Sequence, residues 1–280
     1  MLTQAEKGRA FRALHARAGA FIIPNPWDAG TARLLAQLGF EALATTSAGC
    51  AFSAGQQDNT MDRREVLAHV STIASATSLP VSADLENGFG DAPEIVAETI
   101  WMAAAAGAVG GSIEDMSRQP GHPIYAREHA VERVRAAAEA VRALPFPFTL
   151  TARAENYLAG QPDLGDTIER LQAYQMAGAD VLYAPGPTSK DDIAAIVSSV
   201  DRPVNVVMGL QGVQLSLADL SAIGVRRVSV GSALSRAALG AFLRAAGEML
   251  EHGTFAFAGE AVSYREINAM FKAAPARLAL

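Results

Sequence analysis

The sequence predicts a single (β/α)₈ barrel, in which eight parallel strands alternate with helices. Short apolar stretches and helical patterns alternate eight times along the chain, and parallel strands need helical crossovers of this kind. The length of 280 residues is ordinary for one such barrel. No G-x-G-x-x-G motif follows the first strand, so the alternative, an open doubly wound sheet that binds dinucleotides, has little support.

Two kinds of signal mark the strands. In LLAQLGFEALATTS, MAAAAGAVGGSIED, YQMAGADVLYAP and LSAIGVRRVSVG, a helix ends in Gly, which tolerates the positive φ of that position. In AFIIPN, LPVSADLE, PFPFTLTAR and RPVNVVM, Pro or Ala precedes an apolar run. The strands are therefore expected near residues 20–24, 41–46, 80–84, 109–114, 147–153, 179–184, 203–208 and 227–231.

The helices between these strands have recognisable beginnings. Ser189 and Ser216 each precede a helical pattern and have Asp three residues further on, which resembles a capping box. Pro93 suits the first turn of the helix that follows it. Between residues 127 and 144 the apolar positions have the spacing of one helical face.

Composition limits the class of protein. Half of the residues are hydrophobic and 19% are charged, which provides a sizeable core and argues against disorder. The net charge of −6 comes without a Lys/Arg cluster, so neither nucleic acid nor an anionic membrane is an expected partner. Cys50 is the only cysteine, which excludes an internal disulfide and a CxxC zinc site. No apolar signal core or 18-residue apolar run occurs, so we expect a soluble, cytoplasmic protein.

Acidic side chains dominate the carboxyl ends of the expected strands, where barrels place their active sites. Asp84, Glu86 and Glu114 are the main group, and Arg153 lies among them. Clustered carboxylates repel one another unless a cation or a shared proton compensates, and oxygen ligands without His or Cys favour Mg²⁺ or Mn²⁺. The guanidinium of Arg153 could pair with a substrate carboxylate or phosphonate. Any one of the acids could instead cap a helix or form an ion pair.

Three of these segments carry a family resemblance. ADLENGFG, GSIED and LTARAEN resemble segments of the isocitrate lyase / phosphoenolpyruvate mutase superfamily, and the resemblance extends from FIIPNPWDAG to VGSALSR. It implies a Mg²⁺-dependent barrel that binds a 2-oxo acid or its enolate. Asp84 would be the direct metal ligand, and Asp58, Glu86 and Glu114 would hold the ion mostly through water.

The resemblance also implies a substrate site and an assembly. Backbone amides and a hydroxyl of the turn after strand two would bind the substrate's carboxylate or phosphonyl group. The expected substrate-binding residues are Thr46, Ser47, Ala48, Gly49, Asp58, Arg153, Glu155 and Asn205. The family forms oligomers that exchange the last helix, so a homodimer or homotetramer is expected. We therefore divide the chain into a barrel at 1–251 and a C-terminal part at 252–280, with a linker at 252–259 and a helix near 262–273.

The loop after strand four departs from the family pattern. The lyase branch carries a Cys-Gly-His sequence there, whereas this chain has Pro120, Gly121 and His122. Proline has no ionisable group and cannot replace that acid/base. His122, whose alternative role is a solvated loop residue, and Arg118 remain the candidate catalytic residues beside Arg153.

Further departures narrow the chemistry. Pro185 stands where many lyases of the family have Glu, and none of the three lysines lies at a strand end, which argues against a Schiff-base aldolase. Cleavage of isocitrate or methylisocitrate is disfavoured. The leading hypothesis is a metal-dependent lyase that cleaves or decarboxylates a 2-oxo acid such as oxaloacetate. The alternatives are a 2-oxo acid binding protein with little catalysis, a C–P bond enzyme of the phosphoenolpyruvate mutase type, and a phosphate-binding barrel that uses VGSALSR.

Overall fold

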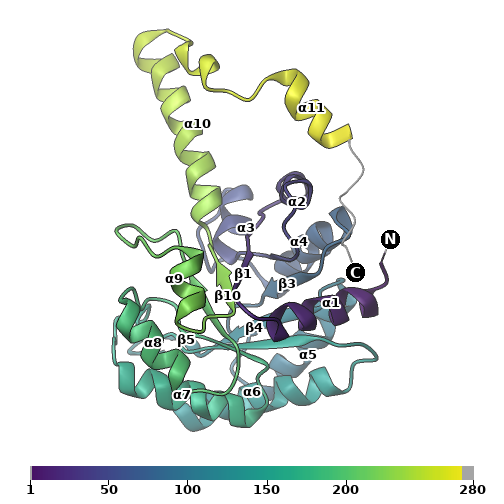
Figure 1. Cartoon of the computed structure of the whole chain (residues 1–280), viewed down its shortest axis with the longest axis vertical. Coiled ribbons are helices and arrows are strands. Elements are labelled where there is room, and N and C mark those ends of the chain that lie inside the picture. The colour runs from purple at the N-terminus through teal and green to yellow at the C-terminus, as the bar shows by residue number, and fades with distance from the viewer. Residues whose placement is uncertain (1, 273–280) are drawn as a thin grey trace.

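The computed structural model describes residues 2–272 and contains an eight-stranded parallel barrel surrounded by helices (Figure 1). The strands follow one another in the order β1-β10-β9-β8-β7-β4-β3-β2, and each neighbouring pair is parallel. Between β2 and β1, the amide of Ala44 donates a hydrogen bond of 3.1 Å to the carbonyl of Pro24, which nearly closes the barrel. The predicted fold class is confirmed.

All eight predicted strands are present, each within the expected range. The barrel strands are β1 (Phe21–Ile23), β2 (Leu43–Ala44), β3 (Val81–Asp84), β4 (Gly110–Glu114), β7 (Thr149–Arg153), β8 (Val181–Tyr183), β9 (Val204–Val207) and β10 (Arg227–Ser229). A separate antiparallel hairpin of β5 (Met116–Gln119) and β6 (His122–Ile124) follows β4. This hairpin occupies the segment that the sequence had suggested only as a loop.

Helices cover the outside of the barrel and extend beyond it. They are α1 (Gln4–Ala16), α2 (Ala29–Gln37), α3 (Ser47–Ser53), α4 (Arg63–Ala76), α5 (Pro93–Ala105), α6 (Arg127–Arg142), α7 (Leu164–Ala177), α8 (Lys190–Ser198), α9 (Leu217–Ala222), α10 (Ala233–His252) and α11 (Tyr264–Lys272), with a short 3₁₀ helix at Ala256–Gly259. No helix among residues 2–272 combines the length and the apolar character needed to cross a lipid bilayer.

The predicted helix starts are confirmed with one difference. At α9, Ser216 accepts a hydrogen bond from the amide of Asp219, and the Asp219 carboxylate accepts one from the amide of Ser216, so the capping box is complete. At α8, Ser189 accepts from the amide of Asp192 without the reciprocal bond. Pro93 occupies the first turn of α5. The two serine caps satisfy helix N–H groups that have no partner within the helix, and Pro93 has no N–H group at a position where that group would lack such a partner.

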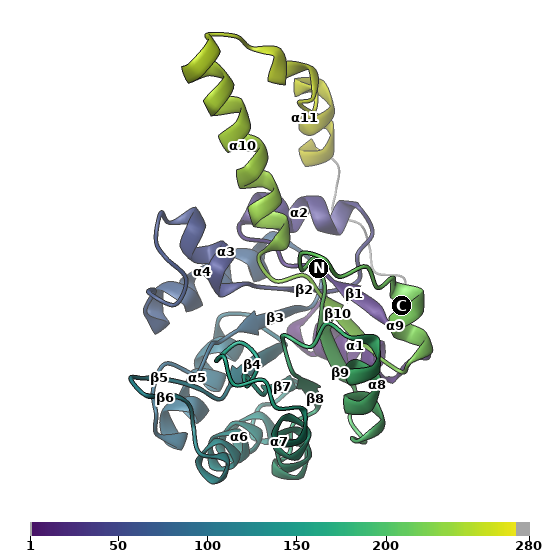
Figure 2. The same ribbon diagram turned by 90° about the vertical axis from the view of Figure 1, so that its left-hand side faces the viewer.

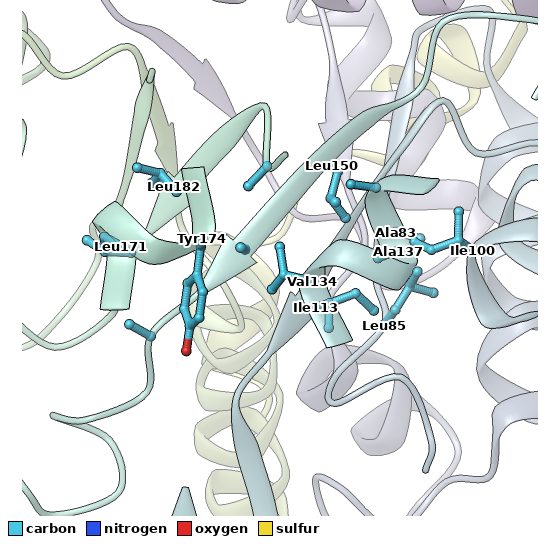
Figure 3. Close-up of a cluster of buried hydrophobic side chains, with 14 of the residues drawn as sticks. Ala83, Leu85, Ile100, Ile113, Val134, Ala137, Leu150, Leu171, Tyr174 and Leu182 are labelled. Carbon is cyan, nitrogen blue, oxygen red and sulfur yellow. The ribbon is translucent and has the colours of Figure 1, made fainter. Parts of the chain in front are cut away.

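The main apolar core lies between the barrel strands and the surrounding helices. Figure 3 shows Leu150 of β7 and Ile113 of β4 near Val134 of α6, and Leu171 of α7 near Leu182 of β8. Side chains alternate along a strand, so the residues between these outward apolar ones point into the barrel. There the side chains are mostly polar, as at Thr151, whereas branched apolar residues are usual inside such barrels.

The C-terminal part extends away from the barrel. In Figures 1 and 2, α10 leaves β10 and projects outward, and the chain then returns through α11 toward α2. The predicted linker at 252–259 contains the 3₁₀ helix, and the helix expected near 262–273 is α11, which runs from Tyr264 to Lys272. Residue 273 of that expected helix, and the rest of the C-terminal part to 280, lie outside the described residues.

Candidate active site

A cavity of about 230 Å³ lies at the axis of the barrel, and all eight barrel strands or the loops that follow them contribute to its wall. Asp84, Arg153, Tyr183 and Asn205 line it from the ends of β3, β7, β8 and β9. The loops contribute exposed groups, among them Asp58 after α3. The pocket thus lies where active sites of this fold are found.

Arg153 is the electrostatic centre of this site. Its Nη1 lies 3.1 Å from Asp84 Oδ1, its Nη2 3.0 Å from Glu114 Oε2, and its Nε 2.8 Å from Glu155 Oε1. The guanidinium also lies over the ring of Tyr183, 5.2 Å from its centroid. One arginine therefore faces three carboxylates, so the group is short of positive charge by about two when all three acids are ionised.

Burial raises the pKa values of two acids around Arg153, Glu114 and Glu155, and so determines whether they are ionised. It raises the pKa of Glu114 to about 8, against the opposing effect of Arg153, and Glu155 and Asp84 raise it further. Burial also raises the pKa of Glu155. Near neutral pH the site therefore holds a proton among these carboxylates unless another cation enters. Coupled carboxylates of this kind share their protons rather than titrate singly.

The turn after β2 meets Asp84 directly. Its Oδ2 accepts a 3.0 Å hydrogen bond from the amide of Ser47, the first residue of α3. Thr46 caps this helix, its hydroxyl accepting from the amide of Gly49. Thr46, Ser47 and Ala48 line the pocket, whereas Gly49 packs behind it against Thr46 and Trp27. The predicted substrate turn and the predicted metal ligand are thus adjacent.

The acids do not form a preassembled metal cage. Among residues 2–272, no three His, Cys, Asp or Glu side chains come together closely enough to hold a metal ion. Asp84 and Asp58 both line the pocket, and Ser112 Oγ lies 3.4 Å from Asp84 Oδ1. Mg²⁺ commonly keeps several waters and uses only one or two carboxylates. This donor set of carboxylate and hydroxyl oxygens therefore fits Mg²⁺.

Glu114 and Glu155 lie behind Arg153 rather than on the pocket wall. Glu155 is 1% exposed, and its amide donates to Asp115 Oδ1 at 2.8 Å. Asp115 is held in turn by Arg170 and Tyr174 of α7, at 3.0 and 2.5 Å from its Oδ2. This buried network fixes the backbone that carries Arg153 and Glu155.

Glu86 and the residues of the hairpin face each other beside the pocket. Glu86 has a φ of 51° and pairs with the guanidinium of Arg118, which also donates to Asn59. His122 is exposed in β6. Glu86, Arg118 and His122 are not among the residues that line the cavity. The structure therefore brings Asp58, Asp84, Arg153, Asn205 and the turn after β2 together, and leaves these three outside.

Several pocket residues had no part in the predicted site. Asn25, Arg227, Ser229 and Arg236 line the cavity. Asn25 Oδ1 accepts hydrogen bonds from the amides of Val230 and Gly231, both at 3.0 Å. Arg227 and Ser229 are two residues apart on β10, and this alternation of polar residues in a strand was the signal that could have placed them inside the barrel.

Comparisons with known proteins agree on one family. The model of the family described as phosphoenolpyruvate phosphomutase matches residues 11–250. The oxaloacetate decarboxylase of Chromohalobacter salexigens is 32% identical over 236 residues, which cover 82% of this chain and 80% of that protein.

Solved structures show the same similarity. A protein from Burkholderia cenocepacia J2315 to which lyase or mutase activity is ascribed is 68% identical, with a TM-score of 0.94 and coverage of 96% of this chain and 97% of its own. Phosphonopyruvate hydrolase in complex with oxalate and Mg²⁺ is 27% identical, with a TM-score of 0.84 and coverage of 95% of both chains.

Proposed function

Since the chain belongs to the phosphoenolpyruvate phosphomutase family, we propose that it is a Mg²⁺-dependent lyase that acts on a 2-oxo acid. One observation carries the proposal: Asp84 and Arg153, 3.1 Å apart, line the same cavity at the carboxyl ends of the strands. Recognition of a 2-oxo acid requires two groups. One is a carboxylate that can hold a divalent ion, here that of Asp84, and the other is a guanidinium that can bind the carboxylate of the substrate, here that of Arg153.

Asp84 would hold the ion directly, with Asp58 across the pocket, and Glu86 and Glu114 would act through water. When bound, Mg²⁺ supplies the positive charge that stabilises the enolate formed as the bond next to the 2-oxo group breaks. An added cation also compensates the surplus of carboxylates around Arg153. Mn²⁺ could take the same position because it favours the same oxygen ligands.

The chain's own residues bind and orient the substrate. The turn at Ser47 and Ala48 and the guanidinium of Arg153 would bind its carboxylate beside Asp84. Burial raises the pKa of Tyr183 to about 12, so its hydroxyl keeps its proton and can donate a hydrogen bond into the pocket. Asn205 is 2% exposed and fully engaged with Ser229 and Arg227, which fixes its position in the wall.

Decarboxylation of a β-keto acid such as oxaloacetate is the reaction that these residues suit. Carbon dioxide leaves without removal of a proton, so the step needs no general base. Pro120 provides none where the lyase branch has a cysteine. His122 is the acid/base candidate for cleavage of another C–C bond, which would require the hairpin to bring it to the pocket. The similarity to an oxaloacetate decarboxylase supports the first of these reactions.

Thermal unfolding with oxalate, a mimic of enolpyruvate, tests the metal and substrate site. We expect the unfolding temperature to rise only when oxalate and Mg²⁺ are both present, because ligand at about 100 times its Kd adds about 2.7 kcal/mol to the free energy of unfolding. Asp84→Ala should abolish the rise. Asp191→Ala, which removes an exposed carboxylate from α8, should retain it. A rise without Mg²⁺, or one that persists in Asp84→Ala, contradicts the proposal.

A second candidate is a C–P bond enzyme, which the similarity to phosphonopyruvate hydrolase favours. Release of pyruvate from oxaloacetate and from phosphonopyruvate, measured side by side with Mg²⁺, separates the two reactions. Mg²⁺-dependent binding without turnover of either compound would instead indicate a 2-oxo acid binding protein.

A further inference from the structure

A second arginine, Arg227, is buried at the bottom of the cavity. It begins β10 and is 5% exposed, yet it lines the same pocket as Asp84 and Arg153. Its Nε donates to Asn205 Oδ1 at 2.8 Å and its Nη2 to Thr151 Oγ1 at 2.9 Å. The third contact, at 3.4 Å, joins its Nη1 to Nε2 of His15 in α1.

His15 does not neutralise this arginine. Its Nδ1 lies 2.8 Å from the carbonyl of Phe11, which can only accept, so Nδ1 carries the proton and Nε2 accepts from Arg227. Burial and the charge of Arg227 lower the pKa of His15 to about 3. The ring is therefore neutral at physiological pH, and all three partners of the guanidinium are uncharged.

The contrast with Arg153 shows what is missing. Arg153 pairs with three carboxylates, whereas no ion pair within residues 2–272 includes Arg227. A guanidinium has five N–H donors, and three atoms of the protein accept from this one. Burial lowers the pKa of Arg227 to about 10, against an opposing effect of Tyr183, and the guanidinium stays protonated at neutral pH. A buried cation is costly unless an anion pairs with it.

The walls above Arg227 suit a small anionic ligand. Hydroxyl and amide groups of Ser82, Ser112, Asn205 and Ser229 line the same cavity as Arg227. Within the described chain, no carboxylate that lines the pocket forms an ion pair with Arg227, because Asp84 pairs with Arg153 and Asp58 belongs to the exposed loop. An anion at the bottom must therefore come with the ligand.

We propose that Arg227 binds a second carboxylate of the substrate and thereby selects a 2-oxo dicarboxylate over a 2-oxo monocarboxylate. This inference rests on the proposed function: the 2-oxo carboxylate lies beside Asp84 and Arg153, and the chain of the substrate points down the barrel axis. Arg227 is then a specificity-determining residue, and His15 is a positioning residue that orients the guanidinium from below. An ion pair with Arg227 stabilises this carboxylate and opposes its loss as carbon dioxide. A confirmed preference would therefore favour cleavage of another C–C bond, for which His122 is the acid/base candidate, over decarboxylation.

Two pairs of ligands of matched length test this preference in the unaltered protein. 3,3-Difluorooxaloacetate is compared with 2-oxobutyrate, and 2-oxoglutarate with 2-oxopentanoate, by titration calorimetry in the presence of Mg²⁺. Only the dicarboxylate of each pair can form a charged hydrogen bond with Arg227. We therefore expect the dicarboxylate to bind about 10- to 100-fold more tightly than the monocarboxylate in at least one of the two pairs. Equal affinities within both pairs overturn the inference.

Variants assign the preference to one arginine. Arg227→Met should remove it and retain Mg²⁺-dependent binding of oxalate, while Arg227→Lys, which keeps the charge, should retain part of it. Arg236→Met is the matched control, because Arg236 also lines the pocket but is exposed, with its Nε on Ser232 of its own helix. A preference that survives Arg227→Met, or that Arg236→Met removes, contradicts the assignment.

A wrong assignment of the function and a wrong assignment of Arg227 give different binding results. If oxalate and Mg²⁺ do not bind to the unaltered protein, the proposed function is wrong. If they bind but the dicarboxylates have no advantage, only the role of Arg227 is wrong. Should Arg227→Met not fold, the ligand pairs on the unaltered protein and the Arg227→Lys variant still decide.

Discussion

At the scale of single residues, the two pocket arginines differ in what they lack. Arg153 has more carboxylates than it can neutralise, and Arg227 pairs with none among residues 2–272. A divalent cation would compensate the first group and an anion the second. The pocket is therefore polarised along the barrel axis, from acidic at the strand ends to basic at the bottom, and a ligand that carries both a chelating end and a free carboxylate matches this polarity.

The neutral state of His15 predicts a dependence of stability on pH. Its pKa is about 3 in the folded protein and 6.5 in the unfolded chain, so the unfolded chain binds the proton first. This contribution to the free energy of unfolding is complete above pH 6.5 and declines by about 1.4 kcal/mol per pH unit as the pH falls below it. Urea unfolding between pH 5 and 8 should show this decline, and His15→Gln should be free of it.

The matched control is His252→Gln, which replaces an exposed histidine at the end of α10 and should leave the pH dependence unchanged. The comparison uses the difference in the free energy of unfolding between each variant and the unaltered protein. A constant difference for His15→Gln from pH 5 to 8 would show that His15 titrates normally in the folded state.

Sequence reasoning identified one end of the pocket and missed the other. Asp84 and Arg153 were predicted because they follow strands, where the barrel rule places function. Arg227 begins its strand, where that rule expects only structural residues. How far a cavity extends down the axis depends on the sizes of inward side chains from all eight strands. That packing, like the position of Glu114 behind Arg153, is a property of the assembled barrel.

At the scale of elements, the loop between β3 and α5 depends on a helix that packs against it. Glu86, Gly88 and Phe89 adopt positive φ values of 51°, 81° and 63°, and non-glycine residues rarely do so without support. Arg133 of α6 provides it. Its guanidinium donates to three carbonyls of the loop and lies 4.3 Å from the centroid of the Tyr125 ring.

Arg133→Met should therefore affect both stability and the site. Loss of the charged donor removes a partner from the carbonyls of Asn87 and Gly90, whereas the carbonyl of Asp91 keeps its contact with His129. A buried polar group left without a partner costs about 1–3 kcal/mol. We expect a loss of about 2–4 kcal/mol in the free energy of urea unfolding. The Mg²⁺-dependent rise with oxalate should also shrink, because the loop carries Glu86 and directly follows Asp84, the last residue of β3. Arg135→Met, an exposed position on the same helix, should change neither measurement.

The elements themselves were largely predictable. Every barrel strand and the caps at Ser189 and Ser216 follow from local rules of spacing and capping. The β5–β6 hairpin does not, because MSRQPGHPI has no clear alternation and two prolines. The register of its two strands shifts between Met116 and Gln119. Such a segment is ordered by its surroundings, here by Arg118 with Glu86 and Asn59.

At the scale of the whole molecule, α10 exposes several large apolar side chains. Phe242 and Leu243 are each 66% exposed, and Leu250 is 88% exposed. At the end of this arm, α11 contacts α2, where Arg33 donates to the carbonyl of Phe271 and stacks on its ring. Contiguous exposed apolar side chains of this kind mark protein–protein contacts, so the expected oligomer with an exchanged last helix remains our prediction.

Multi-angle light scattering tests this prediction. The mass should be that of a dimer or tetramer at micromolar concentration. The double substitution Phe242→Glu and Leu243→Glu should lower the mass, because charges at a buried interface are strongly unfavourable. Met176→Glu, at an 85% exposed residue of α7, should not. A monomeric unaltered protein contradicts the prediction.

The polar hollow of the barrel has a consequence for the response of the molecule to pressure. A cavity of about 230 Å³ that is lined by polar groups and opens to solvent is filled by water rather than left as a void. Hydrostatic pressure acts on void volume, so this cavity should not make the barrel unusually sensitive to pressure. A ligand that extends from Asp84 to Arg227 would have to displace this water.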